Sequence, residues 1–273
     1  MTTHRPRTAL RVLSLVLLLW GHGLAAQALR TALPTPESPF ETLENPSIPH
    51  QCADVMRAVE ALDPELRFTG LERALPLNQI ESELSLGALD VFCAMLRSPS
   101  RESRWVFIDV PIRLDRQRLA VNAKDTLNPS SLEQLRQSGE AVAVIKGSAH
   151  EEWLGLQGGI QLESKHALSG SLDFSQMRRA RFAFHSEEAL LQTIQTQCPR
   201  QKWRLLPWVV REEGLYFVAS LHLAPGRAGR LRAALAALAE RGELARIAQR
   251  PHVVVQTPLA LEGGRRKPPC WQR

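Results

Sequence analysis

Two short serine-containing loops are the segments of this sequence best suited to hold a small anion. Ser98-Pro99-Ser100-Arg101 and Gly147-Ser148-Ala149 each follow an apolar run, and the second opens a predicted helix. A helix start offers unpaired amide N–H groups and partial positive charge, and an arginine adds a bidentate donor for a carboxylate. If the loops face each other, they clamp a carboxylate between two halves of the protein. The alternative is that Arg101 is a surface arginine and Ser148 only caps its helix.

The rest of the sequence contains no motif for a named reaction. It has no phosphate-binding glycine loop, no Gly-x-Ser-x-Gly elbow and no histidine pair at zinc-ligand spacing. Adjacent acidic residues such as Glu151-Glu152 and Glu187-Glu188 are typical of helix starts and solvated turns rather than of an acid–base pair. His185 ends a predicted strand, where α/β proteins often place ligand groups. On this inventory we expect no catalytic residues, no metal site and no cofactor.

Alternating strands and helices must position these loops. Apolar runs predict strands over residues 29–33, 89–95, 105–112, 118–123, 141–145, 181–184 and 216–221. Helical spacing predicts helices over residues 52–62, 77–86, 131–136, 187–196, 230–238 and 243–248, with Ser130 or Ser131 capping the third. This alternation predicts an α/β architecture with largely parallel sheets.

Residues 1–28 have the layout of a secretory signal peptide: three arginines, an apolar run and then small residues. A membrane anchor is the alternative, but the run is short for ~30 Å of hydrocarbon. Its removal takes away three of the 34 basic residues and none of the 28 acidic ones, so the net charge falls from +6 to +3. The remaining basic clusters are short and no aromatic ladder accompanies them, which argues against nucleic acid as a partner. We therefore expect a soluble, monomeric protein of the periplasm.

Export also changes how the four cysteines are interpreted. Cys52, Cys93, Cys198 and Cys270 are widely spaced, with no pair at zinc-ligand or redox-dithiol spacing. In an oxidising compartment one or two disulfides can form, and four cysteines allow three full pairings. Because Cys93 lies in an apolar run, a buried free thiol is its alternative.

The order of these pieces resembles extracellular solute-binding protein family 3. The segments that carry the resemblance follow the family's order and spacing: Ser38-Pro39-Phe40, Leu86-Gly87-Ala88-Leu89-Asp90, Ser98 to Arg101 with Phe107 to Ile112 after it, Val142 to Ser148, and Arg232 to Ile247. The family has in these places a Pro-Phe loop, a helix-to-strand step, a Thr-x-x-Arg turn before a strand, a Val-Ala-Val-x-x-Gly-Thr signature and a closing pair of helices. The resemblance covers residues 29–250.

This resemblance implies a two-lobed α/β fold, the type 2 periplasmic binding protein fold, with two hinge-crossing strands near residues 110–114 and 213–217. Lobe one would comprise residues 29–112 and 215–273, including a C-terminal tail, and lobe two residues 113–214. Lobe one would then hold three of the four cysteines, so we expect a free thiol or a link through Cys270. The implied partners are a small-molecule solute and an inner-membrane ABC permease.

The resemblance also implies a set of ligand-binding residues. Arg101 would pair with a ligand carboxylate beside Ser98, with Ser148 and Ala149 completing the anion site from the second lobe and Phe40 forming an apolar wall. The family's acid for the ligand ammonium falls on Ser186, which leaves Glu187 and Glu37 as candidates for that contact: Ser98, Arg101, Ser148, Ala149, Phe40, Glu37, Ser186 and Glu187 form the full set.

The function that the resemblance implies is reversible binding of a small carboxylate-bearing, amino acid-like solute for an ABC transporter. One alternative is a periplasmic sensor or partner-binding protein without a transport role. Another is a periplasmic lyase or dehydratase on the same fold, with Glu187 or Glu37 as general acid. The sequence contains no legible acid–base pair, so we predict that the protein is not an enzyme.

Overall fold

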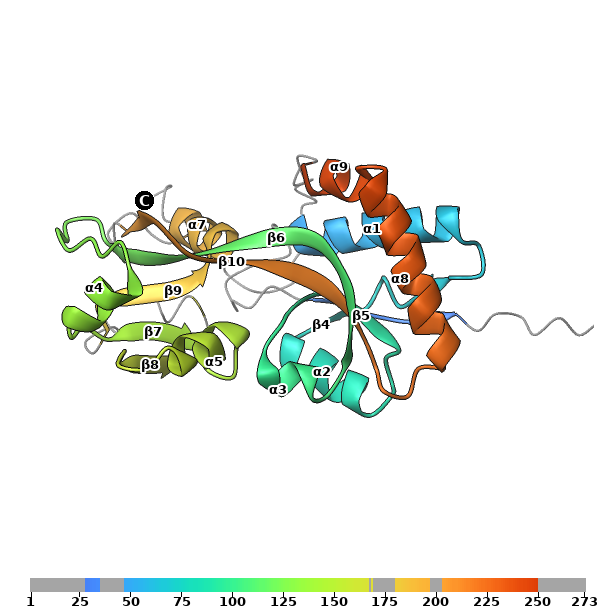
Figure 1. Ribbon diagram of the computed structural model, residues 1–273, viewed down its shortest axis with the longest axis horizontal. Coiled ribbons are helices and arrows are strands. Elements are labelled where there is room, and N and C mark those ends of the chain that lie inside the picture. Colours follow the sequence, from blue (N-terminus) through green and yellow to red (C-terminus); the bar gives the residue numbers. More distant parts are fainter. Residues whose placement is uncertain (1–27, 35–46, 167, 169–179, 197–202, 250–273) are drawn as a thin grey trace, which may run out of the picture.

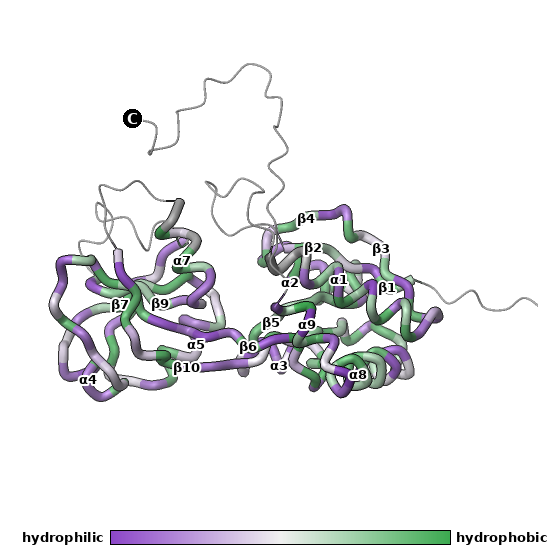
Figure 2. Tube along the Cα trace, turned by 90° about the horizontal axis from the view of Figure 1, so that it is seen from above, coloured by the Kyte–Doolittle hydropathy of each residue, from purple (hydrophilic) through white to green (hydrophobic). Residues whose placement is uncertain are grey.

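Two lobes joined by two long strands make up the computed structural model, which describes residues 28–34, 47–166, 168, 180–196 and 203–249 (Figure 1). The connecting strands are β6 (Val106–Asn122) and β10 (Trp203–Ala219). Seen from above, they form the narrow connection between the lobes, and their crossing is hydrophilic (Figure 2). The predicted signal peptide up to residue 27, Glu37 and Phe40 lie outside the described residues.

The first lobe contains the chain before β6 and the chain after β10. Its elements are β1 (Leu29–Arg30), β2 (Leu33–Pro34), α1 (Ser47–Leu62), β3 (Phe68–Thr69), β4 (Ala74–Leu75), α2 (Leu77–Ser85), β5 (Val91–Leu96), α3 (Pro99–Glu102), α8 (Pro225–Glu240) and α9 (Glu243–Gln249). The predicted pair of closing helices around Gly242 is confirmed. Gly242 has a φ of 69°, a left-handed conformation that glycine adopts without steric strain, and this allows α8 to end there.

The second lobe lies between the two crossings. Its elements are α4 (Leu132–Gln137), β7 (Val142–Ile145), α5 (Ala149–Leu156), β8 (Leu162–Lys165), β9 (Phe182–Ser186) and α7 (Glu187–Thr196). Of the two serines predicted to cap α4, Ser131 is the cap, since its side chain accepts a hydrogen bond from the Gln134 N–H.

One six-stranded sheet runs through both lobes in the order β5-β10-β6-β9-β7-β8. The pairs β5/β10, β10/β6 and β6/β9 are antiparallel, whereas β9/β7 and β7/β8 are parallel. The expectation of largely parallel sheets is therefore wrong for this sheet. The reason is that the chain crosses between the lobes twice in opposite directions, so the two longest strands pair antiparallel.

The crossing strands are longer than the sequence indicated. Residues 105–112 and 118–123 were expected to form separate strands, but β6 is continuous, and β10 begins at Trp203 rather than at residue 216. Charged residues between the two apolar parts hide the continuity, because this stretch has no apolar core on either face. In the middle of these strands, Leu114 pairs with Gly214 and Asp115 with Glu213. The exact lobe boundaries stay a prediction.

Each lobe has its own apolar core. In the first, α1, α8 and α9 pack on one face of β5 and its neighbours, around Met56, Phe217 and Leu235. In the second, Phe182 and Phe184 pack with Leu154 of α5 on one face of the sheet, and Leu190 of α7 packs on the other. Each of the two predicted serine loops is therefore anchored beside a different apolar core.

A disulfide joins Cys52 of α1 to Cys93 of β5, so the alternative of a free thiol at Cys93 is wrong. Both cysteines lie in the first lobe, and the bond ties α1 to the sheet. Cys198 and Cys270 lie outside the described residues, which leaves the expected free thiol or tail-borne link a prediction. Within the described ranges, no helix has the length and apolar character needed to cross a membrane.

Candidate functional site

The two predicted serine loops meet between the lobes. Ser98 precedes α3 in lobe one, and Ser148 precedes α5 in lobe two. Glu152, one turn into α5, accepts hydrogen bonds from the Ser100 backbone N–H (2.9 Å) and from Ser100 Oγ (2.5 Å). The Ser100 hydroxyl also lies 3.1 Å from Ser98 Oγ. The site predicted for a ligand carboxylate is thus occupied by the carboxylate of Glu152. We call Ser98 and Ser100 the serine seat.

The electrostatics of Glu152 fit this placement. Burial alone would raise the pKa of its carboxyl, but hydrogen bonds from Ser100 and Ser98 and the charge of Arg101 outweigh burial and hold the pKa below its usual range. Glu152 is therefore ionised at neutral pH, and it places a negative charge of lobe two against the start of α3 in lobe one.

Arg101 is buried in lobe one, with 5% of its surface exposed. Its Nη2 donates to Glu81 Oε1 at 2.8 Å, and its Nη1 donates to the Leu96 carbonyl at 3.2 Å. Glu81 also pairs with Arg104 at 3.4 Å. The guanidinium that was expected to meet a ligand carboxylate thus already has a carboxylate partner from α2.

Ser148 and Ala149 have structural roles at the start of α5. Ser148 Oγ accepts a hydrogen bond from the Glu151 N–H (3.1 Å), and Glu151 accepts one in return from the Gly147 N–H (2.6 Å). Gly147 has a φ of 74°, the left-handed conformation that suits glycine. Ala149 is buried in an apolar cluster whose other members come from lobe one, so the helix start touches both lobes.

Ser186 and Glu187, the candidates for the ammonium contact, lie where β9 ends and α7 begins. Ser186 pairs with Gln117 in register, and its Oγ lies 3.3 Å from His185 Nδ1 and accepts from the Ala189 N–H at 3.4 Å. Glu187 is ion-paired with Arg118, and its second oxygen lies 3.4 Å from Arg116. Both arginines belong to β6, so Glu187 fastens α7 to a crossing strand.

Sequence reasoning missed a second group of polar residues between the lobes. Asp115 and Gln117 alternate along one face of β6 and are 4% and 1% exposed. Asp115 Oδ2 and Gln117 Oε1 have no hydrogen-bond partner among the described residues. One sequence signal could have found them: Asp115, Gln117 and apolar Leu119 alternate along a strand. Residues that alternate in this way share one face, so the two polar residues lie on the same face as buried Leu119. We call Asp115 and Gln117 the hinge acceptors.

The environment of Asp115 raises the pKa of its carboxyl. Burial raises the pKa of its carboxyl to about 6, helped by the charge of Glu188, while His185, Arg113 and a hydrogen bond with Gln117 act in the opposite direction. Arg113 itself is ion-paired with Glu188 and donates to Gln51, so it is not a dedicated partner for Asp115.

Two stacked histidines lie beside this group. The rings of His150, from α5, and His185, from β9, have centroids 4.1 Å apart, and Phe184 meets His150 edge-on at 5.7 Å. Burial lowers the pKa of His150 well below its usual value, and the charges of His185, Arg101 and Arg211 lower it further. His150 is therefore neutral at neutral pH, and its Nε2 has no partner among the described residues.

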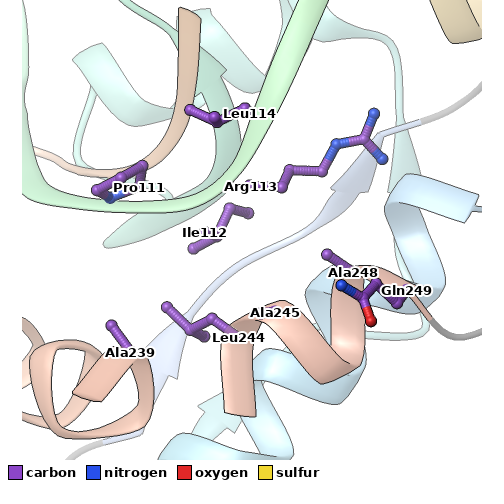
Figure 3. A pocket seen from close by; sticks show the side chains of 9 residues that line it. All are labelled: Pro111, Ile112, Arg113, Leu114, Ala239, Leu244, Ala245, Ala248 and Gln249. Atoms are coloured by element: carbon purple, nitrogen blue, oxygen red, sulfur yellow. The ribbon is translucent and has the colours of Figure 1, made fainter. Parts of the chain in front are cut away.

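A pocket of about 620 Å³ lies on the lobe-one side of the crossing. Figure 3 shows β6 residues on one side of it and residues of α8 and α9 on the other. Its lining is mostly apolar and includes none of the predicted ligand-binding residues: Pro111, Ile112, Arg113, Leu114, Ala239, Leu244, Ala245, Ala248 and Gln249. Elsewhere, the described residues contain no cluster of three or more His, Cys, Asp or Glu side chains that could bind a metal ion.

Comparison with solved structures identifies the architecture. The chain matches the probable amino-acid ABC transporter extracellular-binding protein ytmK from Bacillus subtilis with a TM-score of 0.62, at 14% identity over 81% of this chain and 96% of that one. It matches a histidine kinase sensor domain with similarity to periplasmic binding proteins with a TM-score of 0.63, at 16% identity over 81% and 94%. The fold is that of the type 2 periplasmic binding proteins.

A third match widens the range of functions on this fold. It is the ancestral amino acid-binding protein AncCDT-1, a precursor of cyclohexadienyl dehydratase, with a TM-score of 0.58 at 16% identity over 81% of this chain and 93% of that one. The sequence matches no protein-family model and no curated protein. The predicted type 2 fold is confirmed, and with it the structural resemblance to amino acid-binding proteins of family 3.

Proposed function

We propose that this protein reversibly binds a small amino acid-like solute between its two lobes and does not convert it. The observation that carries the proposal is the meeting of the two serine loops, each rooted in a different lobe, at Glu152 and Ser100. The antiparallel strands β6 and β10 connect the two lobes, and such a pair of connecting strands can act as a hinge. Closure would desolvate a bound solute and strengthen its polar contacts.

A transport role in the periplasm is the version of this function that we favour. The predicted signal peptide would export the chain, and an ABC permease would receive the solute, as the similarity to an extracellular transporter-binding protein suggests. A sensor role uses the same cleft, and the similarity to a histidine kinase sensor domain supports it. Neighbouring permease and ATPase genes would favour transport, whereas a neighbouring histidine kinase gene would favour sensing.

An amino acid carboxylate would have to share or take over the serine seat. Arg101 is paired with Glu81, and Glu152 holds the seat itself. The proposal therefore has Glu152 exchange with a ligand carboxylate when one binds, or remain in place when the ligand brings none.

A thermal-shift screen tests the proposal. The purified protein is scanned against amino acids, amines, dicarboxylates and sugar acids. A solute present at a hundred times its Kd adds about 2.7 kcal/mol to the free energy of unfolding and raises the Tm. If no compound of any class shifts the Tm, solute binding is contradicted, and a partner-binding role takes its place.

A further inference from the structure

The serine seat and the hinge acceptors make opposite demands on a ligand. At the serine seat, the hydrogen-bond donors of Ser100 are already used by an ionised carboxylate of the chain. At the hinge acceptors, two buried oxygens lack donors among the described residues. A ligand that complements this arrangement brings hydrogen-bond donors and positive charge, and it does not bring a second carboxylate.

The serine seat leaves little room for another anion. Glu152 contacts Ser100 through both carboxylate oxygens, one to the backbone N–H and one to the hydroxyl. The nearest buried cation, Arg101, is balanced by Glu81 at 2.8 Å. A ligand carboxylate placed there would lie beside the charge of Glu152, and like charges close together in a partly buried site repel each other.

The hinge acceptors require a donor. An ionised carboxylate oxygen and an amide oxygen can only accept hydrogen bonds, and leaving either unsatisfied when buried costs about 1–3 kcal/mol. Asp115 and Gln117 are both more than nine-tenths buried and stand two residues apart on one strand face. An ammonium or a guanidinium group carries several N–H donors and the charge that an ionised Asp115 needs.

The arginines around Asp115 are each ion-paired with another acid. Arg113 is paired with Glu188, and Arg118 and Arg116 with Glu187, all on or beside β6. On β10, which pairs with this part of β6, Arg211 is paired with Glu213. The charges of His185 and Arg113 act on the Asp115 carboxyl, but its Oδ2 has no hydrogen-bond donor among the described residues.

We propose, on the basis of the proposed solute-binding function, that the solute is a small organic amine or guanidine without a carboxylate, held by its cationic group at Asp115 and Gln117, while Glu152 supplies the carboxylate at the opposite end. The protein's own glutamate thus takes the place of the amino acid carboxylate. Selectivity for the decarboxylated compound follows, because an amino acid must displace Glu152 whereas its amine need not.

Matched ligand pairs test this by calorimetric titration of the purified full chain. Agmatine and arginine differ by one carboxylate, as do putrescine and ornithine and also cadaverine and lysine. The expected result is that at least one amine has a Kd lower than that of its parent amino acid by a factor of about ten or more. This is the size of effect expected when the amino acid must break one charged hydrogen bond or accept one contact between like charges. An amino acid that binds as tightly as its amine in all three pairs would overturn the inference and leave solute binding intact.

Two variants locate the contacts. Asp115→Asn should weaken amine binding by roughly ten- to hundred-fold, the effect of losing a charged partner. Asp109→Asn is its control, since Asp109 lies on the same strand but is 74% exposed; it should leave the Kd unchanged. Equal amine affinity in Asp115→Asn and the wild type would overturn the placement at the hinge acceptors.

Glu152→Gln should reduce or reverse the preference for the amine, because the seat loses its charge and can admit a ligand carboxylate. Glu133→Gln, an exposed acid on α4 of the same lobe, is its control. An unchanged amine-to-amino-acid ratio in Glu152→Gln would contradict the role given to Glu152. If none of the six compounds binds, the inference fails; if the wider screen is also negative, the solute-binding function fails with it.

Discussion

The hinge acceptors are buried and the serine seat is partly exposed, and only the serine seat is satisfied by the chain itself. Glu81 of α2 pairs with Arg101 within lobe one, and Glu152 of α5 reaches from lobe two to Ser100. On β6, by contrast, Asp115 and Gln117 retain acceptors without donors among the described residues. The difference shows where the fold supplies hydrogen-bond partners. A helix can extend a long acidic side chain into a neighbouring loop. A residue on a strand face depends on the groups that pack over that face of the sheet.

The largest expected effect comes from the satisfied end. Glu81→Gln removes the charge that balances buried Arg101, and an uncompensated buried charge costs about 3–5 kcal/mol. Urea unfolding should therefore show a loss of about 3 kcal/mol or more in the free energy of unfolding. The control is Glu102→Gln, whose partner Arg97 is more exposed and whose loss should stay below about 1 kcal/mol. Equal losses would mean that Arg101 does not depend on Glu81.

The next effect comes from the unsatisfied end and has the opposite sign. Burial moves the pKa of Asp115 from an ordinary 3.8 to about 6. Between these values the folded state binds the proton more tightly than the unfolded state, so without a ligand the free energy of unfolding falls as the pH rises from about 4 to about 6, by up to ~3 kcal/mol.

Asp115→Asn does not titrate and should lack this loss. Its free energy of unfolding relative to wild type should therefore rise across the same pH range, as measured by urea unfolding at several pH values. The exposed Asp109→Asn gives the comparison curve. A pH-independent difference between Asp115→Asn and wild type would show that Asp115 is not held in a desolvated site.

A smaller effect concerns the contact between the lobes. Glu152→Gln weakens the hydrogen bonds to Ser100, and because the pair is partly exposed we expect about 1 kcal/mol, or roughly a five-fold shift toward open conformations. Small-angle scattering should record a larger radius of gyration than for wild type or for Glu133→Gln. An unchanged radius would indicate that other contacts, such as the burial of Ala149 against lobe one, hold the lobes together.

The smallest effect distinguishes the two interpretations of Ser148. Ser148→Ala and Ser131→Ala each remove a helix cap, and each should cost about 1 kcal/mol of stability. Once a ligand is found by the screen, only Ser148→Ala should also raise its Kd if Ser148 contacts the ligand. The same Kd in both variants would leave Ser148 as a cap alone.

Much of the fold could be predicted from the sequence because its signals are local. Helix α7 has the predicted bounds, Ser131 caps α4, and Gly242 separates α8 from α9. The crossing strands were only half predicted, since their charged middle parts gain their partners from each other rather than from a core. The Cys52–Cys93 bond was one of several pairings that spacing allowed.

The candidate site was predictable in position but not in its partners. The loop at Ser148 was predicted as a helix start and the loop at Ser98 as a turn after a strand, and the structure brings their neighbourhoods together. Asp115, Gln117 and His150 were not found, because a polar residue is recognised as buried only when its strand face is known. Glu152 was taken for a solvated acid of a helix start, whereas it reaches across to lobe one.

By itself the sequence determined the order of the elements, their caps and turns, and the resemblance in motif order, because these depend on residues within a few positions of each other. Only the tertiary structure decided which charges meet. Ser100 and Glu152 are 52 positions apart and Arg101 and Glu81 are 20 apart, so no local pattern links them. The energy of a charged pair depends on distance through space and on burial, and the chain folded into two lobes sets both.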